Sequence, residues 1–384
     1  MPSPGLSPAP TPVPTPDPSP GLSPAPPPDP VLETLEGMTI EQKAAQMLMA
    51  GIEGLTAGTD AVAAIRETGA GGVILFSRNV ESAEQLSRLT ASLRELNGEH
   101  IPLLIGVDEE GGRVSRMPPE VENLPAAFTL REKGTDYAAL GGVLAAECLT
   151  FGFNINFAPV LDIRSNASNT VIGDRAYGSA WEEVTAAGVH VMNGLSGAGV
   201  APVIKHFPGH GDTAADSHTE LPVVTKTVDQ LWERELLPFQ AAIDAGAPAV
   251  MVGHILLEAV DDGLPCSLSP RVVNGLLREE MGFRGVVCTD DLTMAAVTGS
   301  YDIGEAAVLA AEAGCDLLLV CHGADALLEA RDALLAAIDS GRLSEPRLDE
   351  SVTRLLKLKA LYAEPPEDVP TPAEVNAMIR EFLG

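Results

Sequence analysis

Between Lys205 and Pro222 the chain reads KHFPGHGDTAADSHTELP, which concentrates imidazole, carboxylate and amino groups in one short segment. Groups of this kind are costly to bury without partners. The glycines and the proline in the first half favour a shaped loop over a helix. Because the segment directly follows the apolar run 200–204, we expect it at the rim of an active site.

Asp216 and His218 lie two residues apart within this segment. An extended backbone would place both side chains on one face, where the carboxylate could orient the imidazole as a general acid and base. A metal site is the alternative, since His206, His210 and Asp212 are also ligand types. The spacing matches no HExxH motif, so we expect neither a metal nor a cofactor.

A second candidate is Asp290, which directly follows the apolar run 285–289. A carboxylate at the end of a buried strand can act as a nucleophile or stabilise charge. Its neighbour Asp291 precedes Leu-Thr-Met and is expected to cap the following helix. The chemistry is therefore assigned to Asp290 and the cap to Asp291.

The segment 107–116 reads VDEEGGRVSR and combines acids, glycines and two arginines. Its glycines allow the backbone to approach a ligand closely. Asp108 would accept hydrogen bonds from substrate hydroxyls, and Arg116 would hold a carbonyl or a carboxylate. A surface loop with internal ion pairs is the alternative. Arg175, in the segment DRAYG, adds another polar group expected at the rim.

Eight apolar runs predict the strands that position these residues. Each is nearly continuously apolar, as expected for parallel strands covered on both faces, and helical patterns separate many of them. Eight alternations favour a (β/α)8 TIM-type barrel, whose chemistry lies at the strand ends. A doubly wound sheet is the alternative, but no GxGxxG follows the first run. The runs are 47–52, 72–76, 103–107, 156–163, 200–204, 249–254, 285–289 and 316–321, and the main helical patterns are 60–68, 83–96, 137–151, 181–196, 228–245 and 304–313.

Residues 1–30 form a low-complexity tail in which SPGLSPAP occurs twice. Its proline content favours an extended, semi-rigid spacer, either a tether or a dispensable extension. Residues 31–384 are predicted to form a single catalytic domain. Thr39 and Gln42 fit a capping box that opens its first helical turn.

Composition excludes several classes of partner. A net charge of −30 disfavours nucleic acid, and no apolar stretch reaches the roughly 18 residues of a membrane span. The five cysteines are odd in number and lack CxxC spacing, which indicates no disulfide framework. With no signal peptide recognised, we expect a cytoplasmic protein, with export or surface tethering through the tail as the alternative. Oligomeric state is not indicated.

Together these motifs resemble glycoside hydrolase family 3, and most closely its single-domain bacterial β-N-acetylhexosaminidases that act on peptidoglycan fragments. VDEEGGRVSR, INFAPVLDI, GDRAYG, KHFPGHGDTAADSHTELP and CTDDLTM occur in the expected order. The resemblance implies a retaining exo-β-N-acetylglucosaminidase that releases terminal β-linked N-acetylglucosamine. It assigns the nucleophile to Asp290, the acid/base dyad to His218 and Asp216, and substrate binding to Asp108, Arg116, Arg175, Lys205 and His206.

Four other functions stay open. A phosphorylase would use phosphate in place of water, which a histidine acid/base does not repel. A β-glucosidase of the same family would differ in the sugar that it accepts. A metal-dependent hydrolase would lose activity in a chelator. A non-catalytic cell-wall binding protein would retain sugar binding without turnover.

Overall fold

The computed structural model describes residues 1, 5, 29–131, 134–213, 221–364, 366 and 368–384. Most of the Pro-rich tail lies outside these residues, as do Asp216 and His218. The described chain begins with helix α1 (Pro30–Glu36), which the side chain of Asp29 caps.

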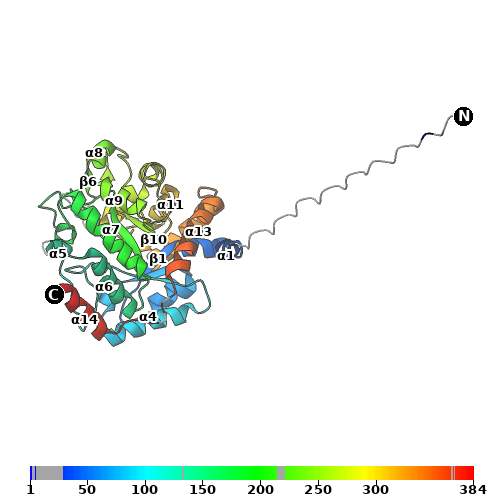
Figure 1. Cartoon of the computed structure of the whole chain (residues 1–384). Helices are drawn as coiled ribbons and strands as arrows, with labels where there is room; N and C mark the ends of the chain where they lie inside the picture. Colours follow the sequence, from blue (N-terminus) through cyan, green and yellow to red (C-terminus); the bar gives the residue numbers. More distant parts are fainter. Residues whose placement is uncertain (2–4, 6–28, 132–133, 214–220, 365, 367) are drawn as a thin grey trace.

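Eight parallel strands form a barrel, and helices form the layer around it (Figure 1). The strand order is β10-β1-β2-β3-β4-β5-β7-β9, and a bridge between Cys288 and Leu317 joins the two ends. The predicted (β/α)8 barrel is confirmed. Its strands are β1 (Leu48–Gly51), β2 (Gly72–Leu75), β3 (Leu104–Val107), β4 (Ile155–Asn156), β5 (Ala201–Phe207), β7 (Ala249–Val252), β9 (Val286–Thr289) and β10 (Leu318–Val320).

Packing inside the barrel explains why two of its strands carry glycine. A Cβ atom added at Gly72 would lie 2.8 Å from the terminal methyl group of Met49, and one added at Gly106 would lie 2.9 Å from the ring of Phe157. Real Cβ atoms do not come this close, so the large side chains occupy the space that the glycines leave. Met49 is therefore a core residue, and the barrel interior is filled by side chains.

The capping box predicted at the start of α2 (Ile40–Gln46) is present. Gln42 N donates to Thr39 Oγ1 and Thr39 N donates to Gln42 Oε1. The other helices and short elements are α3 (Thr59–Val62), η1 (Ala63–Glu67), η2 (Ser77–Asn79), α4 (Ala83–Asn97), α5 (Ala127–Leu130), α6 (Tyr137–Thr150), η4 (Gly173–Arg175), α7 (Trp181–Gly197), β6 (Val223–Val224), α8 (Val228–Trp232), α9 (Leu236–Asp244), β8 (Leu256–Leu257), η5 (Cys266–Leu268), η6 (Arg271–Glu280), α10 (Ala295–Thr298), α11 (Ile303–Ala313), α12 (Ala324–Asp339), α13 (Glu345–Tyr362) and α14 (Pro372–Leu383).

Prolines account for two differences from the predicted elements. The helix predicted over 228–245 is divided into α8 and α9, because Pro238 lacks the N–H that a continuous helix would need and is tolerated only in a first turn. The strand predicted over 156–163 keeps regular pairing only in β4. Pro159 cannot donate to a ladder, and the chain beyond it pairs with β5 through an isolated bridge between Val160 and Lys205.

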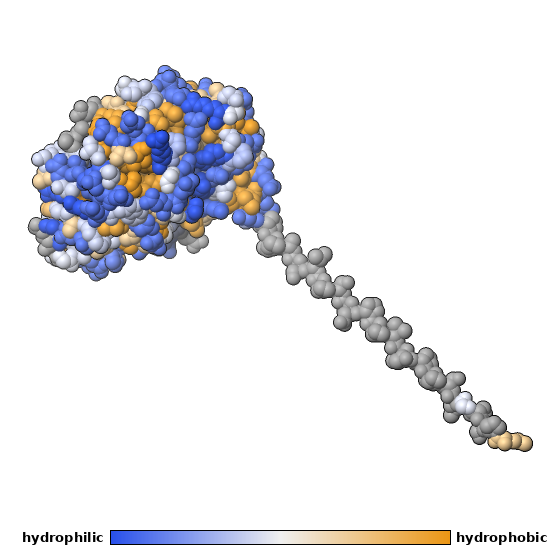
Figure 2. Space-filling model, turned by 90° about the horizontal axis from the view of Figure 1, so that it is seen from above, coloured by the Kyte–Doolittle hydropathy of each residue, from blue (hydrophilic) through white to orange (hydrophobic). Residues whose placement is uncertain are grey.

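The surface and the cysteines agree with the composition. Figure 2 shows hydrophilic residues interleaved with smaller hydrophobic patches over the visible face. All five cysteines are buried and unpaired. Among the helices in the described ranges, none is both long enough and apolar enough to cross a membrane.

A fully buried carboxylate closes the barrel at the start of β10. Asp316 has no exposed surface, and it accepts hydrogen bonds from Val287 N next to it, from Ser351 of α13 and from Arg278 of η6 at 2.6 Å. Arg354 donates to the same group at 3.0 Å. One side chain therefore joins β9, β10 and two outer helices.

We predict that Asp316→Ala lowers the free energy of unfolding by about 3–5 kcal/mol, since it leaves buried Arg278 without its counter-charge. Denaturant titration of both proteins measures the difference. Glu305→Ala is the matched control, because Glu305 pairs with the half-exposed Arg342, and such surface pairs contribute less than about 1 kcal/mol. Equal losses in the two variants would contradict the role of Asp316.

Candidate active site

A pocket of about 900 Å³ opens at the carboxyl ends of the barrel strands. Asp108 follows β3, Lys205 and His206 lie near the end of β5, and Asp290 follows β9. Further lining residues come from the ends of β2 and β10 and from the segments after β3 and β9. The pocket thus lies where a barrel of this kind carries its chemistry. Its polar and aromatic lining includes Phe76, Arg78, Asp108, Arg113, Arg116, Thr170, Arg175, Lys205, His206, His210, Asp290, Asp291, Thr293, Thr298 and His322.

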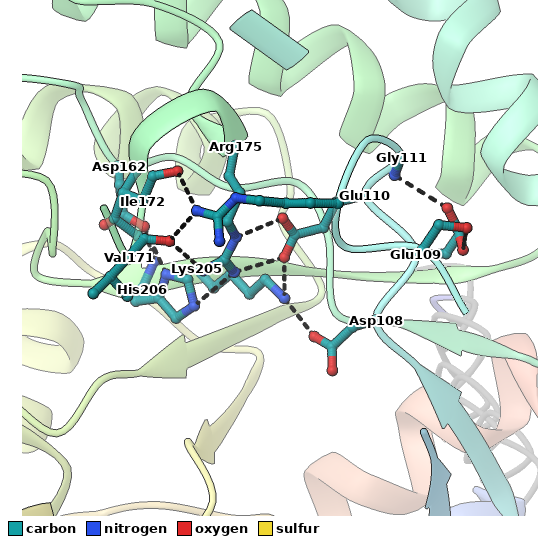
Figure 3. Close-up of polar contacts among 12 residues, drawn as sticks. Asp108, Glu109, Glu110, Gly111, Asp162, Val171, Ile172, Arg175, Lys205 and His206 are labelled. Carbon is teal, nitrogen blue, oxygen red and sulfur yellow. Dashed lines mark hydrogen bonds and ion pairs between the residues drawn. The ribbon is translucent and has the colours of Figure 1, made fainter. Parts of the chain in front are cut away.

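Lys205 is the centre of an ion cluster on the pocket wall (Figure 3). Its side chain is 2% exposed, and its Nζ lies 2.5 Å from Asp108 Oδ1 and 2.8 Å from Glu110 Oε1. Arg175 donates two hydrogen bonds to Glu110, at 2.8 and 2.7 Å. The four groups come from the end of β3, from β5 and from η4, so the barrel fold is what brings them together.

The opposite charges keep this cluster ionised. Burial disfavours the ammonium of Lys205, but Asp108 and Glu110 outweigh that effect and raise the pKa of Lys205. Burial likewise disfavours the ionised form of Glu110, but Arg175 and Lys205 hold the pKa of Glu110 well below its usual range. The cluster therefore presents fixed charges and hydrogen-bonding groups to a ligand before it binds.

Asp162 orients His206 within the same wall. Asp162 is fully buried; its Oδ2 lies 2.6 Å from His206 Nδ1, and its Oδ1 accepts from His210 N at 2.5 Å. Burial disfavours the ionised carboxylate, but His206 and His210 lower the pKa of Asp162 overall. Since the guanidinium of Arg175 can only donate, its 3.5 Å contact with His206 Nε2 fits a ring whose proton is on Nδ1.

Asp290 is partly exposed to the pocket. Its backbone N–H donates to Val252 O, which continues the ladder with β7, and its Oδ1 accepts from Asp291 N at 2.8 Å. Burial disfavours the charged form of Asp290, but His254, His206, the Asp291 N–H and Lys205 outweigh it and lower the pKa of Asp290. The carboxylate is thus ionised and available to a bound substrate.

The helix cap predicted at Asp291 is wrong. The following helix, α10, begins at Ala295, and Met294 occupies its N-cap position. Asp291 Oδ1 instead accepts from Thr293 N at 2.9 Å and from Cys321 N at 3.0 Å. A short turn separates Asp291 from the helix, so its carboxylate joins the ends of β9 and β10.

Arg116 makes few side-chain contacts within the described part of the chain. Its Nη1 donates to Ser115 O at 3.2 Å, and its buried Nε has no hydrogen-bond partner within the described part of the chain. The guanidinium therefore retains donors for a ligand. In contrast, the exposed Arg113 is engaged by Asp174 and by backbone carbonyls of residues 170–172.

The structure brings together most of the residues that the sequence singled out. The six that lie in the described ranges line one pocket: Asp108, Arg116, Arg175, Lys205, His206 and Asp290. Asp216 and His218 lie outside the described residues, so their roles stay predictions.

Two buried acids were not among the predicted site residues. Glu110 stands inside the VDEEGGRVSR motif, and Asp162 lies near the end of the predicted strand 156–163, so both positions carried a signal. Their partners, Arg175 and His206, lie 65 and 44 positions away in the chain. That separation is why the pairing was not apparent from the sequence.

Comparisons with known proteins agree with this geometry. The family model described as glycosyl hydrolase family 3 N terminal domain matches residues 39–358. A beta-hexosaminidase of Methylococcus capsulatus is 42% identical over 270 residues, which cover 69% of this chain and 79% of that protein.

Solved structures extend the similarity to the fold. A family 3 beta-N-acetylglucosaminidase from Paenibacillus sp. str. FPU-7 superposes with a TM-score of 0.84 at 43% identity, covering 90% of this chain and 68% of that one. The beta-glucoside phosphorylase BglX superposes with a TM-score of 0.82 at 27% identity, covering 92% and 65%. The chain therefore belongs to glycoside hydrolase family 3, and it is a glycoside hydrolase.

Proposed function

We propose that this protein is a retaining exo-β-N-acetylglucosaminidase that hydrolyses terminal β-linked N-acetylglucosamine. The observation that carries the proposal is the ionised carboxylate of Asp290 in the same pocket as the cluster around Lys205. A nucleophile and a set of hydroxyl-binding groups are thereby available to one sugar. The names beta-hexosaminidase and beta-N-acetylglucosaminidase of the relatives support the choice of sugar.

In the proposed mechanism, Asp290 attacks the anomeric carbon as the bond to the leaving oxygen breaks. His218, oriented by Asp216, gives its proton to that oxygen. The neutral imidazole then takes a proton from water, which attacks the glycosyl–Asp290 ester and releases the sugar and the free carboxylate. Each step inverts the anomeric centre, so the product keeps the β configuration.

The pocket wall supplies the proposed sugar contacts. Asp108 and Lys205 would exchange hydrogen bonds with hydroxyl groups, and Arg116 would donate to the carbonyl of the N-acetyl group. The buried ion cluster forms one wall of the pocket. In this proposal the wall ends the sugar-binding site, so a terminal residue is the one that is cleaved.

Peptidoglycan fragments are the proposed natural substrate. The described pocket lining contains five Lys or Arg side chains and three Asp side chains, although the whole chain carries a net charge of −30. Arg175 and Arg113 are paired with Glu110 and Asp174, which offset much of that charge, so the muropeptide proposal rests on the resemblance to family members that act on peptidoglycan fragments. A preference for neutral chitin oligomers over purified muropeptides would argue against this substrate.

The nucleophile is tested with Asp290→Asn and the matched neighbour Asp291→Asn. We predict that Asp290→Asn slows nitrophenol release from the β-N-acetylglucosaminide by roughly 10⁴-fold or more. Asp291→Asn should stay within about tenfold of wild type, because an amide oxygen still accepts from Thr293 N and Cys321 N. An equal loss of activity in the two variants would contradict the assignment of the nucleophile to Asp290.

The same assay separates the rival functions. Preference for the β-glucoside would indicate a β-glucosidase, and stimulation by phosphate with release of sugar 1-phosphate would indicate a phosphorylase, the activity named for BglX. Loss of activity in EDTA would indicate a metal-dependent hydrolase. Sugar binding without turnover in wild type would indicate a binding protein.

The acid/base role of His218 is tested through the leaving group. We predict that His218→Ala slows cleavage of a nitrophenyl glycoside by about 10²–10⁴-fold. A dinitrophenyl leaving group needs less protonation, so the loss in the step that forms the glycosyl–enzyme should be much smaller, as pre-steady-state kinetics would show. A loss that is the same for both leaving groups would contradict general acid catalysis by His218.

A further inference from the structure

The three consecutive acids that follow β3 point in two directions. Figure 3 shows Asp108 and Glu110 directed toward Lys205, while Glu109 points to the other side, next to Gly111. Alternation of this kind is expected where the backbone is extended. Glu109 has no exposed surface, so its carboxylate cannot contact a substrate in the pocket.

The Glu109 carboxylate accepts three hydrogen bonds from the loop that follows it. Gly111 N donates to Oε1 at 3.1 Å, and both Ser115 Oγ and Arg116 N donate to Oε2 at 2.8 Å. One side chain thus joins both ends of the loop 111–116. The backbone of Glu109 is itself anchored, since it exchanges two hydrogen bonds with the side chain of Asn156 in β4.

This arrangement determines where Arg116 lies. Among the described residues, the guanidinium of Arg116 has one hydrogen bond, to the carbonyl of its neighbour Ser115, and that bond moves with the loop. Other bonds hold the middle of the loop, such as Glu110 N to Val114 O and Gly112 N to Leu124 O, but the backbone N–H of Arg116 itself donates to Glu109. The position of the arginine in the pocket therefore depends on a carboxylate outside the pocket.

Burial of the Glu109 carboxylate carries a free-energy cost, so the hydrogen bonds that it accepts must compensate for it. Burial raises the pKa of Glu109 to about 7, although the donors of Arg116, Ser115 and Gly111 favour its ionised form. Glu147 of α6 is a second buried acid, whose Oε2 has no partner in the described part of the chain. Burial raises the pKa of Glu147, and Glu109 adds to the effect.

We propose that Glu109 is a positioning residue for substrate binding, because it holds the loop 111–116 so that Arg116 meets a carbonyl or carboxylate group of the substrate. The proposal rests on the proposed function only for the identity of that group. Glu109→Gln has nearly the same shape, but it removes the charge, and its amide nitrogen must oppose either Gly111 N or the pair Ser115 Oγ and Arg116 N.

A double-mutant cycle tests whether Glu109 acts through Arg116. At pH 8, Glu109→Gln should raise KM about tenfold, the scale of losing a hydrogen bond to a charged group, while kcat changes less than about threefold. In an Arg116→Ala background the same substitution should have almost no further effect on kcat/KM. Effects that multiply independently in the double variant would overturn the proposal.

Glu147→Gln is the matched control, since it removes a buried acid that makes no described contact with the loop. Its KM should equal that of wild type, and a rise like that of Glu109→Gln would overturn the specific role of Glu109. Ser115→Ala removes one donor to Oε2 and should raise KM by a smaller factor. If Glu109→Gln does not fold, the cycle is run with Ser115→Ala.

Hydrogen exchange gives a readout that does not depend on turnover. The amide of Arg116 should lose protection in Glu109→Ala, which removes both acceptor oxygens, and keep it in Glu147→Gln; unchanged protection in both would overturn the proposal. A wild-type protein without activity on N-acetylglucosaminides would refute the proposed function alone. The cycle would then use the glycoside that is cleaved, and the exchange result would still decide the role of Glu109.

Discussion

The buried ammonium of Lys205 is the group on which the site depends. An isolated charge at 2% exposure would be too costly for the fold to retain, so acids must meet it from other strands. Asp108 and Glu110 do so, and Glu110 in turn is held by two hydrogen bonds from Arg175. The ends of β3 and β5, which lie on either side of β4, and the position of η4 are thereby constrained by one charge.

The ammonium of Lys205 also acts on Asp290, the proposed nucleophile. His254, His206 and the Asp291 N–H outweigh the effect of burial on the pKa of Asp290, and Lys205 adds a smaller contribution, so a carboxylate at the barrel mouth stays ionised. Groups proposed to bind the sugar therefore also prepare the group proposed to attack it. Such preorganised charges act without reorganisation at the moment of reaction, which is where electrostatic catalysis is most effective.

The two ends of the barrel use buried charge for different purposes. At the start of β10, Asp316 is fully buried and pairs with Arg278 and Arg354, which joins outer helices to the barrel. At the carboxyl ends, Arg116 and Asp290 keep accessible polar atoms in a pocket. This division matches barrel enzymes in general, whose stability and chemistry lie at opposite faces.

Local pattern in the sequence was sufficient to predict the alternating elements and the strand ends. Each of Asp108, Lys205 and Asp290 directly follows an apolar run. The pattern therefore predicted that the three lie near one rim, because the ends of parallel strands share an edge. The tertiary structure decided the partners: Glu110 with Arg175 and Asp162 with His206. Those pairs join residues far apart in the chain, and their distances follow from strand register, which no local pattern encodes.

Side-chain direction is a second property that the sequence alone did not determine. The motif DEEGG contains three acids that look equivalent in the sequence, yet Asp108 and Glu110 face the pocket and Glu109 is buried behind it. The cap expected at Asp291 and the single helix expected across Pro238 were local inferences too, and turn geometry and a missing N–H overruled them. The sequence by itself determined which residue types meet at the barrel mouth. Only the tertiary structure decided which way each one faces, because burial and partners depend on the whole fold.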